Sequence, residues 1–137
     1  MGDNRIIARC ARGYEDVFAA TTMIDINGTA VDHHFFTAYA PCTVVAVRVT
    51  PIVAGVDVGA VTGMVTRCQG TEAPSAGDSL LTATFDLKGT ADTVISPTLT
   101  TTISSRTLAA GNRLAIDVTG TLTSVVCSVT VFLRWDA

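Results

Sequence analysis

The 137-residue sequence has little charge: charged residues make up 15% of it, with one Lys and two Glu. Lys and Glu commonly fill exposed helix surfaces, so their scarcity disfavours a helical protein. The sequence contains no run near the roughly 18 uninterrupted apolar residues of a membrane span. Asp3, Asn4 and Arg5 stand where an apolar signal core would begin. We therefore expect a soluble protein that is made in the cytoplasm without export and has no membrane partner.

The four cysteines, Cys10, Cys42, Cys68 and Cys127, lie far apart and form no CxxC pair. Four cysteines allow three disulfide pairings, but a cytosolic protein of this length has core enough without covalent cross-links. Free Cys is among the most buried residue types, and these lie in or near apolar runs. The sequence therefore predicts buried, reduced thiols.

Motifs for catalysis and cofactor binding are also missing, since neither G-x-S-x-G nor a phosphate-binding glycine loop occurs. His33 and His34 are neighbours, and adjacent strand residues point to opposite faces, so they cannot hold one metal ion without a turn. A contact of either with Asp25 or Asp32 more often satisfies a turn than catalyses. We expect no enzymatic activity and no cofactor, and leave calcium bound between loops open.

Positive charge is concentrated near the N-terminus. The net charge of −3 provides no basic field that would favour nucleic acid as a partner. Arg5, Arg9 and Arg12 against Asp3 give residues 1–13 a charge of +2, which leaves −5 for the remainder. The pattern is that of a basic arm that orders against an acidic partner, or of a frayed terminus with its arginines in solvent.

The predicted N-terminal arm covers residues 1–18. Ile7, Ala11, Tyr14 and Phe18 recur at helical spacing, whereas residues 5–10 alternate equally well as an extended chain. The sequence leaves both conformations open. Arginine suits contact with an acidic partner because its planar fork pairs with both oxygens of a carboxylate.

From about residue 20 onward, short alternating runs separated by Gly, Pro, Asn and Asp indicate an all-β domain. The clearest strands are predicted over 43–50, 113–119 and 125–134. Weaker candidates cover residues 21–27, 34–40, 60–68, 80–87, 92–99 and 100–108. Eight or nine short strands predict an antiparallel two-sheet, jelly-roll-like sandwich over residues 19–137.

Alternation also predicts which residues are buried. The predicted core residues are Val45, Val47, Val49, Leu114, Ile116, Val118, Val129, Val131 and Leu133. Pro51 cannot donate to a ladder, so its strand ends there, bulges or lies at an edge. Phe35 and Phe36 are adjacent, which places one toward the core and one outward. Trp135 is predicted at an interface, because terminal aromatics rarely stay ordered without something to pack on.

Much of the chain, about residues 33–134, resembles a family of small tailed-phage capsid proteins. The matching segments are TVVAVRVTPIVAGVDVGAVTGMVTR (43–67), DLKGTADTV (86–94), TLAAGNRLAIDVTGTLT (107–123) and the terminal VTVFLRWDA. The family comprises jelly-roll cement or decoration proteins on the outside of the head, and related head-fibre domains. Its usual residue after the L-A-A-G turn is Asp, whereas here Asn112 follows Gly111, which keeps the turn geometry but removes the charge.

The resemblance implies a virion structural protein on the outer surface of the capsid that binds the major capsid protein and has no enzymatic activity. We expect a homo-oligomer, either a dimer or a trimer, on the capsid. No functional residue carries over, because the matched positions are turn and core positions. The candidate capsid or inter-subunit contacts follow from charge and aromatic character: Arg5, Arg9, Arg12, Tyr14, Phe18 and Trp135. The alternative is a phage fibre or head-fibre β-domain that binds a receptor or glycan through loop tips.

Overall fold

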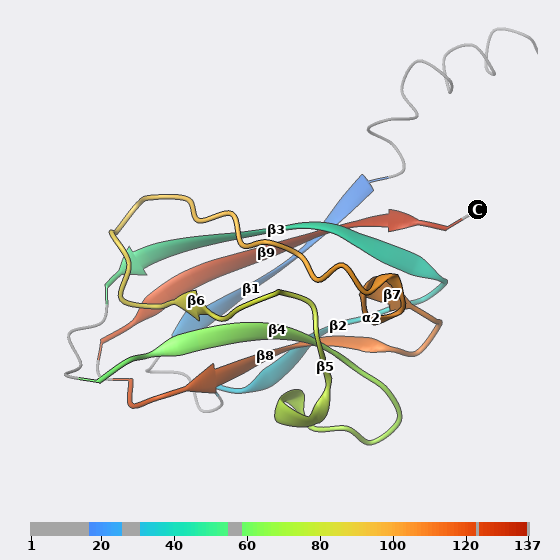
Figure 1. Ribbon diagram of the computed structural model, residues 1–137, viewed down its shortest axis with the longest axis horizontal. Helices are drawn as coiled ribbons and strands as arrows, with labels where there is room; N and C mark the ends of the chain where they lie inside the picture. The colour runs from blue at the N-terminus through green and yellow to red at the C-terminus, as the bar shows by residue number, and fades with distance from the viewer. Residues whose placement is uncertain (1–16, 26–30, 55–58, 123, 137) are drawn as a thin grey trace, which may run out of the picture.

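Two antiparallel sheets lie face to face in the computed structural model, which describes residues 17–25, 31–54, 59–122 and 124–136 (Figure 1). The first sheet has the order β1 (Val17–Asp25), β9 (Val126–Trp135), β3 (Cys42–Val53), β7 (Thr107–Leu108). The second has the order β2 (His33–Thr37), β8 (Arg113–Thr119), β4 (Thr62–Cys68), β5 (Asp78–Ser79), with β6 (Phe85–Asp86) also paired to β4. Two short helices, η1 (Pro74–Ala76) and α2 (Ile103–Arg106), complete the elements.

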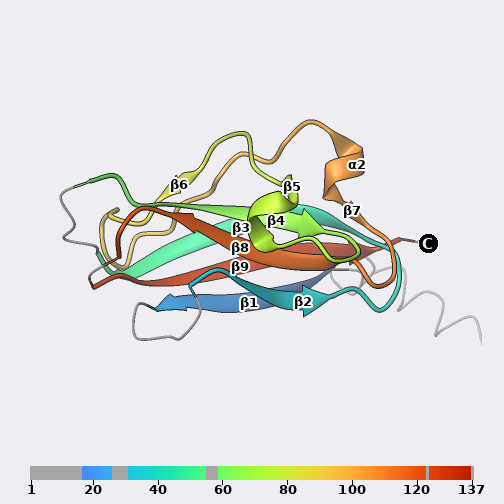
Figure 2. The same cartoon turned by 90° about the horizontal axis from the view of Figure 1, so that it is seen from below.

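Strand pairing follows the jelly-roll pattern. β1 pairs with β9, β2 with β8, β3 with β7, and β4 with β5 and β6. The first half of the chain thus runs antiparallel to the second half, and this long hairpin is folded into two layers. β1 and β2 end up along one edge of the sandwich, opposite β6 and α2 (Figure 2). The predicted fold class is confirmed.

The first strand begins earlier than its sequence pattern indicates. β1 starts at Val17, so Phe18, which the sequence places in the arm, lies within the first sheet. Residues 1–16, the rest of the predicted arm, lie outside the described residues. The three clearest predicted strands correspond to β3, β8 and β9, and β3 extends further than expected, to Val53.

Full strands over residues 80–87, 92–99 and 100–108 are a wrong prediction for most of that length. The structure has β6 and β7, α2, and the isolated bridges Val49↔Ile95 and Leu81↔Leu99. This part of the chain crosses from the second sheet to the first, so it cannot stay in one ladder. Its apolar residues cover the open side of the core instead: Leu80, Leu81, Phe85 and Leu87 are buried.

One hydrophobic core fills the space between the sheets. Of the nine predicted core residues, seven are fully buried, whereas Val45 and Val118 are half-buried. A bulge between Val44 and Ala46 explains the error at Val45, because it gives Val44 the inward position opposite Leu133. A second register shift, between His34 and Phe36, leaves both Phe35 and Phe36 half-buried against the core, so neither points fully outward.

Pro51 is buried inside β3 and sits at a bulge, one of the outcomes that the sequence left open. Two residues earlier, the amide and carbonyl of Val49 both pair with Ile95, on the side of the strand away from β9. Backbone groups of Pro51 face the same side, where its carbonyl accepts the Asp92 amide at 2.7 Å. The missing N–H therefore falls outside the β3–β9 ladder, where it breaks no pairing.

Three of the four cysteines, Cys42, Cys68 and Cys127, lie in the described residues, and all three are fully buried free thiols. Burial raises the pKa of the Cys127 thiol to about 11. Burial, and to a lesser extent the nearby Asp136 charge, also raise the pKa of Cys42. With pKa values raised in this way, both thiols stay protonated at neutral pH. Because the thiolate is the reactive form, neither is an effective nucleophile.

We expect these three thiols to resist alkylation by iodoacetamide in the native protein and to react fully in guanidinium chloride. Mass spectrometry of the labelled protein gives the count, and a Cys10→Ser background removes the thiol outside the described residues. Rapid labelling of all three thiols under native conditions, or a native disulfide among them, would contradict their burial as free thiols.

Candidate interaction surface

Aromatic side chains gather at the end of the sandwich where β1 begins and β9 ends. The register of β1 on β9 sets Phe18 opposite Leu133, in the inward row that also leads to Trp135. The rings of Phe18 and Trp135 stack with centroids 4.3 Å apart and planes 20° apart. Phe36 of β2 approaches Phe18 at 5.9 Å. We call Phe18, Phe36 and Trp135 the aromatic cluster; it brings together two of the residues predicted from sequence.

The cluster is partly open to solvent, because Trp135 keeps 40% of its surface exposed. The chain after Trp135 is tied back to β3: the Asp136 amide donates to the Pro41 carbonyl at 3.0 Å, and the Thr43 hydroxyl donates to the Asp136 carboxylate at 2.8 Å. These bonds hold the indole in place at the end of its strand.

Tyr39, between β2 and β3, is 91% exposed and was not among the predicted contacts. Its turn is held firmly, since the Ala38 amide donates to the Asn112 carbonyl and the Gly111 amide donates to the Ala38 carbonyl, each at 2.8 Å. Gly111 has φ +89°, a backbone angle that favours glycine. The only signal for Tyr39 in the sequence is an aromatic residue between an alternating run and Pro41.

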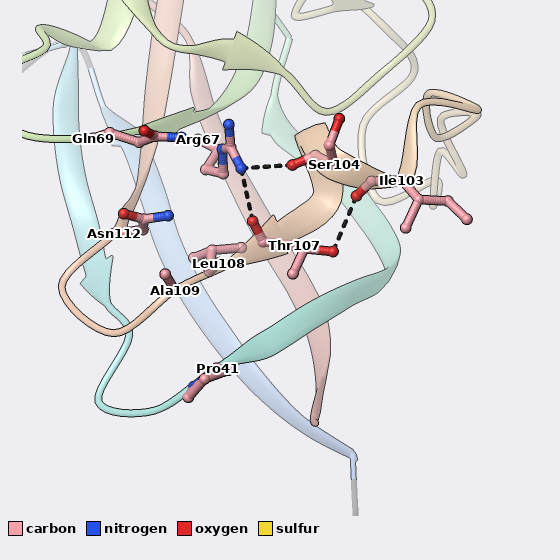
Figure 3. Close-up of a pocket in the computed structure, with 9 residues that line it drawn as sticks. All are labelled: Pro41, Arg67, Gln69, Ile103, Ser104, Thr107, Leu108, Ala109 and Asn112. Atoms are coloured by element: carbon pink, nitrogen blue, oxygen red, sulfur yellow. Dashed lines mark hydrogen bonds between the residues drawn. The ribbon is translucent and has the colours of Figure 1, made fainter. Parts of the chain in front are cut away.

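A groove of about 600 Å³ opens near this end, between the end of β4 and the α2–β7 segment (Figure 3). Its lining residues are Pro41, Arg67, Gln69, Ile103, Ser104, Thr107, Leu108, Ala109 and Asn112. Arg67 donates to the carbonyls of Ser104 at 2.5 Å and Thr107 at 2.8 Å, and pairs with Asp78. This guanidinium holds α2 and β7 against the second sheet. The sequence does not predict that role, because Arg67 is there only one residue of an alternating run.

The two histidines have structural contacts. The His33 Nδ1–H donates to the Val31 carbonyl at 3.0 Å, and in that tautomer Nε2 accepts the Thr22 hydroxyl at 2.5 Å, which links β2 to β1. His34 is exposed, with Nε2 3.3 Å from the Glu72 carbonyl. The side chains of His33 and His34 thus make contacts on different sides of β2, as expected.

Two carboxylates, those of Asp32 and Asp117, lie near the start of β2. The Asp32 carboxylate accepts the Val118 amide at 2.8 Å, and burial together with the Asp32 charge raises the pKa of Asp117. Across the described ranges, no three His, Cys, Asp or Glu side chains come close enough to hold a metal ion. Nor does any helix there have the length and apolarity that crossing a membrane requires.

The other predicted contact residues, Arg5, Arg9, Arg12 and Tyr14, lie outside the described residues. Their link to the surface is covalent: the chain that carries them joins the sandwich at Val17, which pairs with Arg134 and precedes Phe18 of the aromatic cluster. The described part of the chain therefore begins beside the aromatic cluster.

Replacing Trp135 with Ala is expected to lower the free energy of unfolding, because it removes the stack on Phe18, and such pairs contribute about 0.5 to 1.5 kcal/mol beyond the buried area. Trp135→Phe keeps a ring at that position and is expected to lose less. Guanidinium denaturation followed by circular dichroism measures both. Equal stability of the Ala variant and the natural chain would contradict the stabilising stack.

No protein-family model matches the sequence, and no curated protein matches it. The fold does match chains in three solved phage capsid structures. These are the acid-stable capsid of Helicobacter pylori bacteriophage KHP30 (TM-score 0.61, 11% identity, 88% of this chain and 89% of that chain), the capsid of Ralstonia phage GP4 (0.62, 13%, 89% and 86%) and the capsid asymmetric unit of cyanophage Pam1 (0.53, 14%, 88% and 86%). At these identities the likeness is one of fold.

Proposed function

We propose that the protein is a structural component of a phage virion that binds the outer surface of a tailed-phage head and cements or decorates the major capsid protein lattice. The observation that carries this proposal is the fold match to chains in three phage capsid structures, from phages of different hosts. Each match covers most of both chains, so the likeness extends over the whole sandwich and not over one shared pair of strands.

The proposed contact surface combines the aromatic cluster, Tyr39 and the N-terminal arm. Exposed Trp and Tyr side chains are common anchors in protein interfaces, because they bury a large area at little entropic cost. Arginines of the arm add pairing with carboxylates of the capsid subunit. A lattice then multiplies weak contacts into firm attachment when each oligomer makes several of them. In this role the chain acts as a homo-oligomeric binding block, without enzymatic activity or direct contact with the genome.

The second candidate function is a fibre or head-fibre domain that binds a receptor or glycan. Tyr39 at a tightly held turn and the neighbouring groove favour it, because carbohydrate sites commonly use exposed aromatic rings. The two functions place the protein differently: on the capsid lattice in the first case, and on a fibre that reaches the host surface in the second.

The test uses heads of the parent phage grown without this gene, to which purified full-length protein is added back. We expect electron microscopy to show added density at regular positions on the outer capsid surface, and the coated heads to survive harsher heating. Added density on tails or fibres alone, or none, would overturn the proposal.

Variants of the contact surface sharpen that test. Tyr39→Ser combined with Trp135→Ala is expected to lower occupancy on the heads. Val94→Ser is the matched control, because Val94 is an apolar side chain 59% exposed but outside the proposed surface. Equal losses for both would show that general surface apolarity, and not the aromatic surface, drives attachment.

A further inference from the structure

One edge of the first sheet carries no further strand among the described residues. β1 is the outermost strand, pairs with β9 over nine consecutive residues without a register shift, and has no strand on its other side within the described part of the chain. Natural sheet edges are usually protected by charges, proline, bulges or shortness. Residues 17–24 contain no charged residue, proline or glycine. The opposite edge is β7, which is two residues long and adjoins α2.

The outer surface beside the middle of this edge carries uncharged side chains. Ala19, Thr21 and Met23 are exposed on the outer face of β1. Their partners on β9 are Phe132, Thr130 and Ser128, all half-buried. No charged side chain therefore stands beside the middle of this edge, between Val17 and Asp25.

Two contacts fix β1 from the inner side. The Thr22 hydroxyl bonds to His33, and Phe18 contacts Phe36, so both link β1 to β2 of the other sheet. An edge held in this way loses little conformational entropy when another strand pairs with it.

We propose that the β1 edge pairs with β1 of a second copy, antiparallel across a two-fold axis at Thr21, so that the two first sheets become one continuous sheet. This inference deepens the oligomer part of the proposed function and rests on it. Two-fold pairing is the commonest way in which identical chains associate, and it requires a self-complementary surface. Thr21 is the central residue of β1, so an axis there pairs all nine residues of one strand with all nine of the other.

On the outer face, this axis sets exposed Ala19 opposite exposed Met23 of the other copy. The larger Met side chain can pack over the small Ala. On the inner face Phe18 lies opposite Ile24, which is already fully buried within its own copy and adds no new contact. Backbone groups along the strand gain partners regardless of side chain, which is how sheet edges recruit a further strand.

Charge also favours the antiparallel arrangement. Asp25 is the one charged residue of β1, and Val17, at the other end of the strand, has Arg134 as its neighbour on β9. In the dimer, Asp25 of one copy lies opposite Val17 of the other, and that β1 strand separates it from the exposed Arg134. Each end of the interface thus carries both signs of charge, whereas a parallel pairing would bring the two Asp25 carboxylates together.

The first experiment is disulfide cross-linking of the full-length chain with Thr21→Cys in a Cys10→Ser background. The axis sets the two new thiols directly opposite each other, so we expect a covalent dimer on mild oxidation. Thr119→Cys is the control, because Thr119 is also exposed but ends β8 of the other sheet. No dimer with Thr21→Cys, or equal dimer with both, would overturn the proposal.

The second experiment uses charge at the axis. Thr21→Lys and Thr21→Glu each set like charges opposite each other and are expected to be monomers in sedimentation analysis, while their mixture forms dimers. If Thr21→Cys instead cross-links to Cys10 when that residue is kept, the N-terminal segment occupies the edge and the proposal fails. A natural chain that is monomeric yet coats heads overturns this inference alone; a dimer that never coats heads overturns the proposed function alone.

Discussion

Ile116→Asp is expected to leave the chain unfolded at room temperature. Ile116 is fully buried at the centre of β8, between His33 of β2 and Val65 of β4. An unpaired carboxylate there costs several kcal/mol, comparable to the roughly 5 to 15 kcal/mol of a typical domain. The same reasoning applies to Val131, which is fully buried in β9 between β1 and β3.

Thr119→Asp provides the matched control, since it adds the same charge at the exposed end of the same strand. We expect its free energy of unfolding to stay within about 0.5 kcal/mol of that of the natural chain, as is usual for surface substitutions. Circular dichroism and thermal melting distinguish the variants. A soluble Ile116→Asp protein with a sharp transition near that of the natural chain would mean that the core is elsewhere.

Removal of residues 1–16 is expected to leave a folded sandwich that no longer coats heads. The deletion stops before Val17 because β1 begins there and Phe18 stacks on Trp135. A longer deletion would confuse loss of the arm with damage to the sheet. Thermal melting checks the fold, and electron microscopy of mixed heads and protein measures occupancy. Full occupancy by the truncated protein would show that the arm is passive and that the sandwich alone binds.

Substitutions in the full-length chain test the charge of the predicted arm without changing its length. Replacing Arg5, Arg9 and Arg12 with Ala in the full chain is expected to weaken decoration most at low salt, because exposed charge pairs are screened as ionic strength rises. The natural chain should in turn lose affinity between low and high salt, while the triple variant changes less. An identical salt dependence of the two proteins would exclude the arginines as contacts.

Alternation predicts the long strands well because each of them has one buried and one exposed face. β9 follows its pattern, and β3 departs from it only where a bulge exchanges Val45 for Val44. β8 departs from it at two positions, since Ala115 is also fully buried and Val118 is only half-buried. A bulge adds a residue without leaving a composition signal, so its position depends on the partner strand. The crossing over residues 80–108 misleads for a related reason: Leu80, Leu81 and Leu87 are buried as a cover over the core and do not belong to a named strand.

The candidate surface is predictable in part. Phe18 and Trp135 stand out in the sequence as aromatics near the two ends of the chain, yet only the β1–β9 register shows that they stack. Tyr39 joins them through a turn that Asn112 holds from a distant segment. Contacts between residues so far apart in sequence follow from topology, which local pattern does not specify.

Pairing of the first strand with the last has a consequence for how the chain folds. β9 lies between β1 and β3 in the first sheet, so neither of those strands has its long partner until residues 126–135 are made. Contacts this distant in sequence require a large loop-closure entropy to be overcome and slow the folding reaction. During synthesis, the first sheet therefore forms only after β9 has left the ribosome, because β9 is the strand that joins β1 to β3.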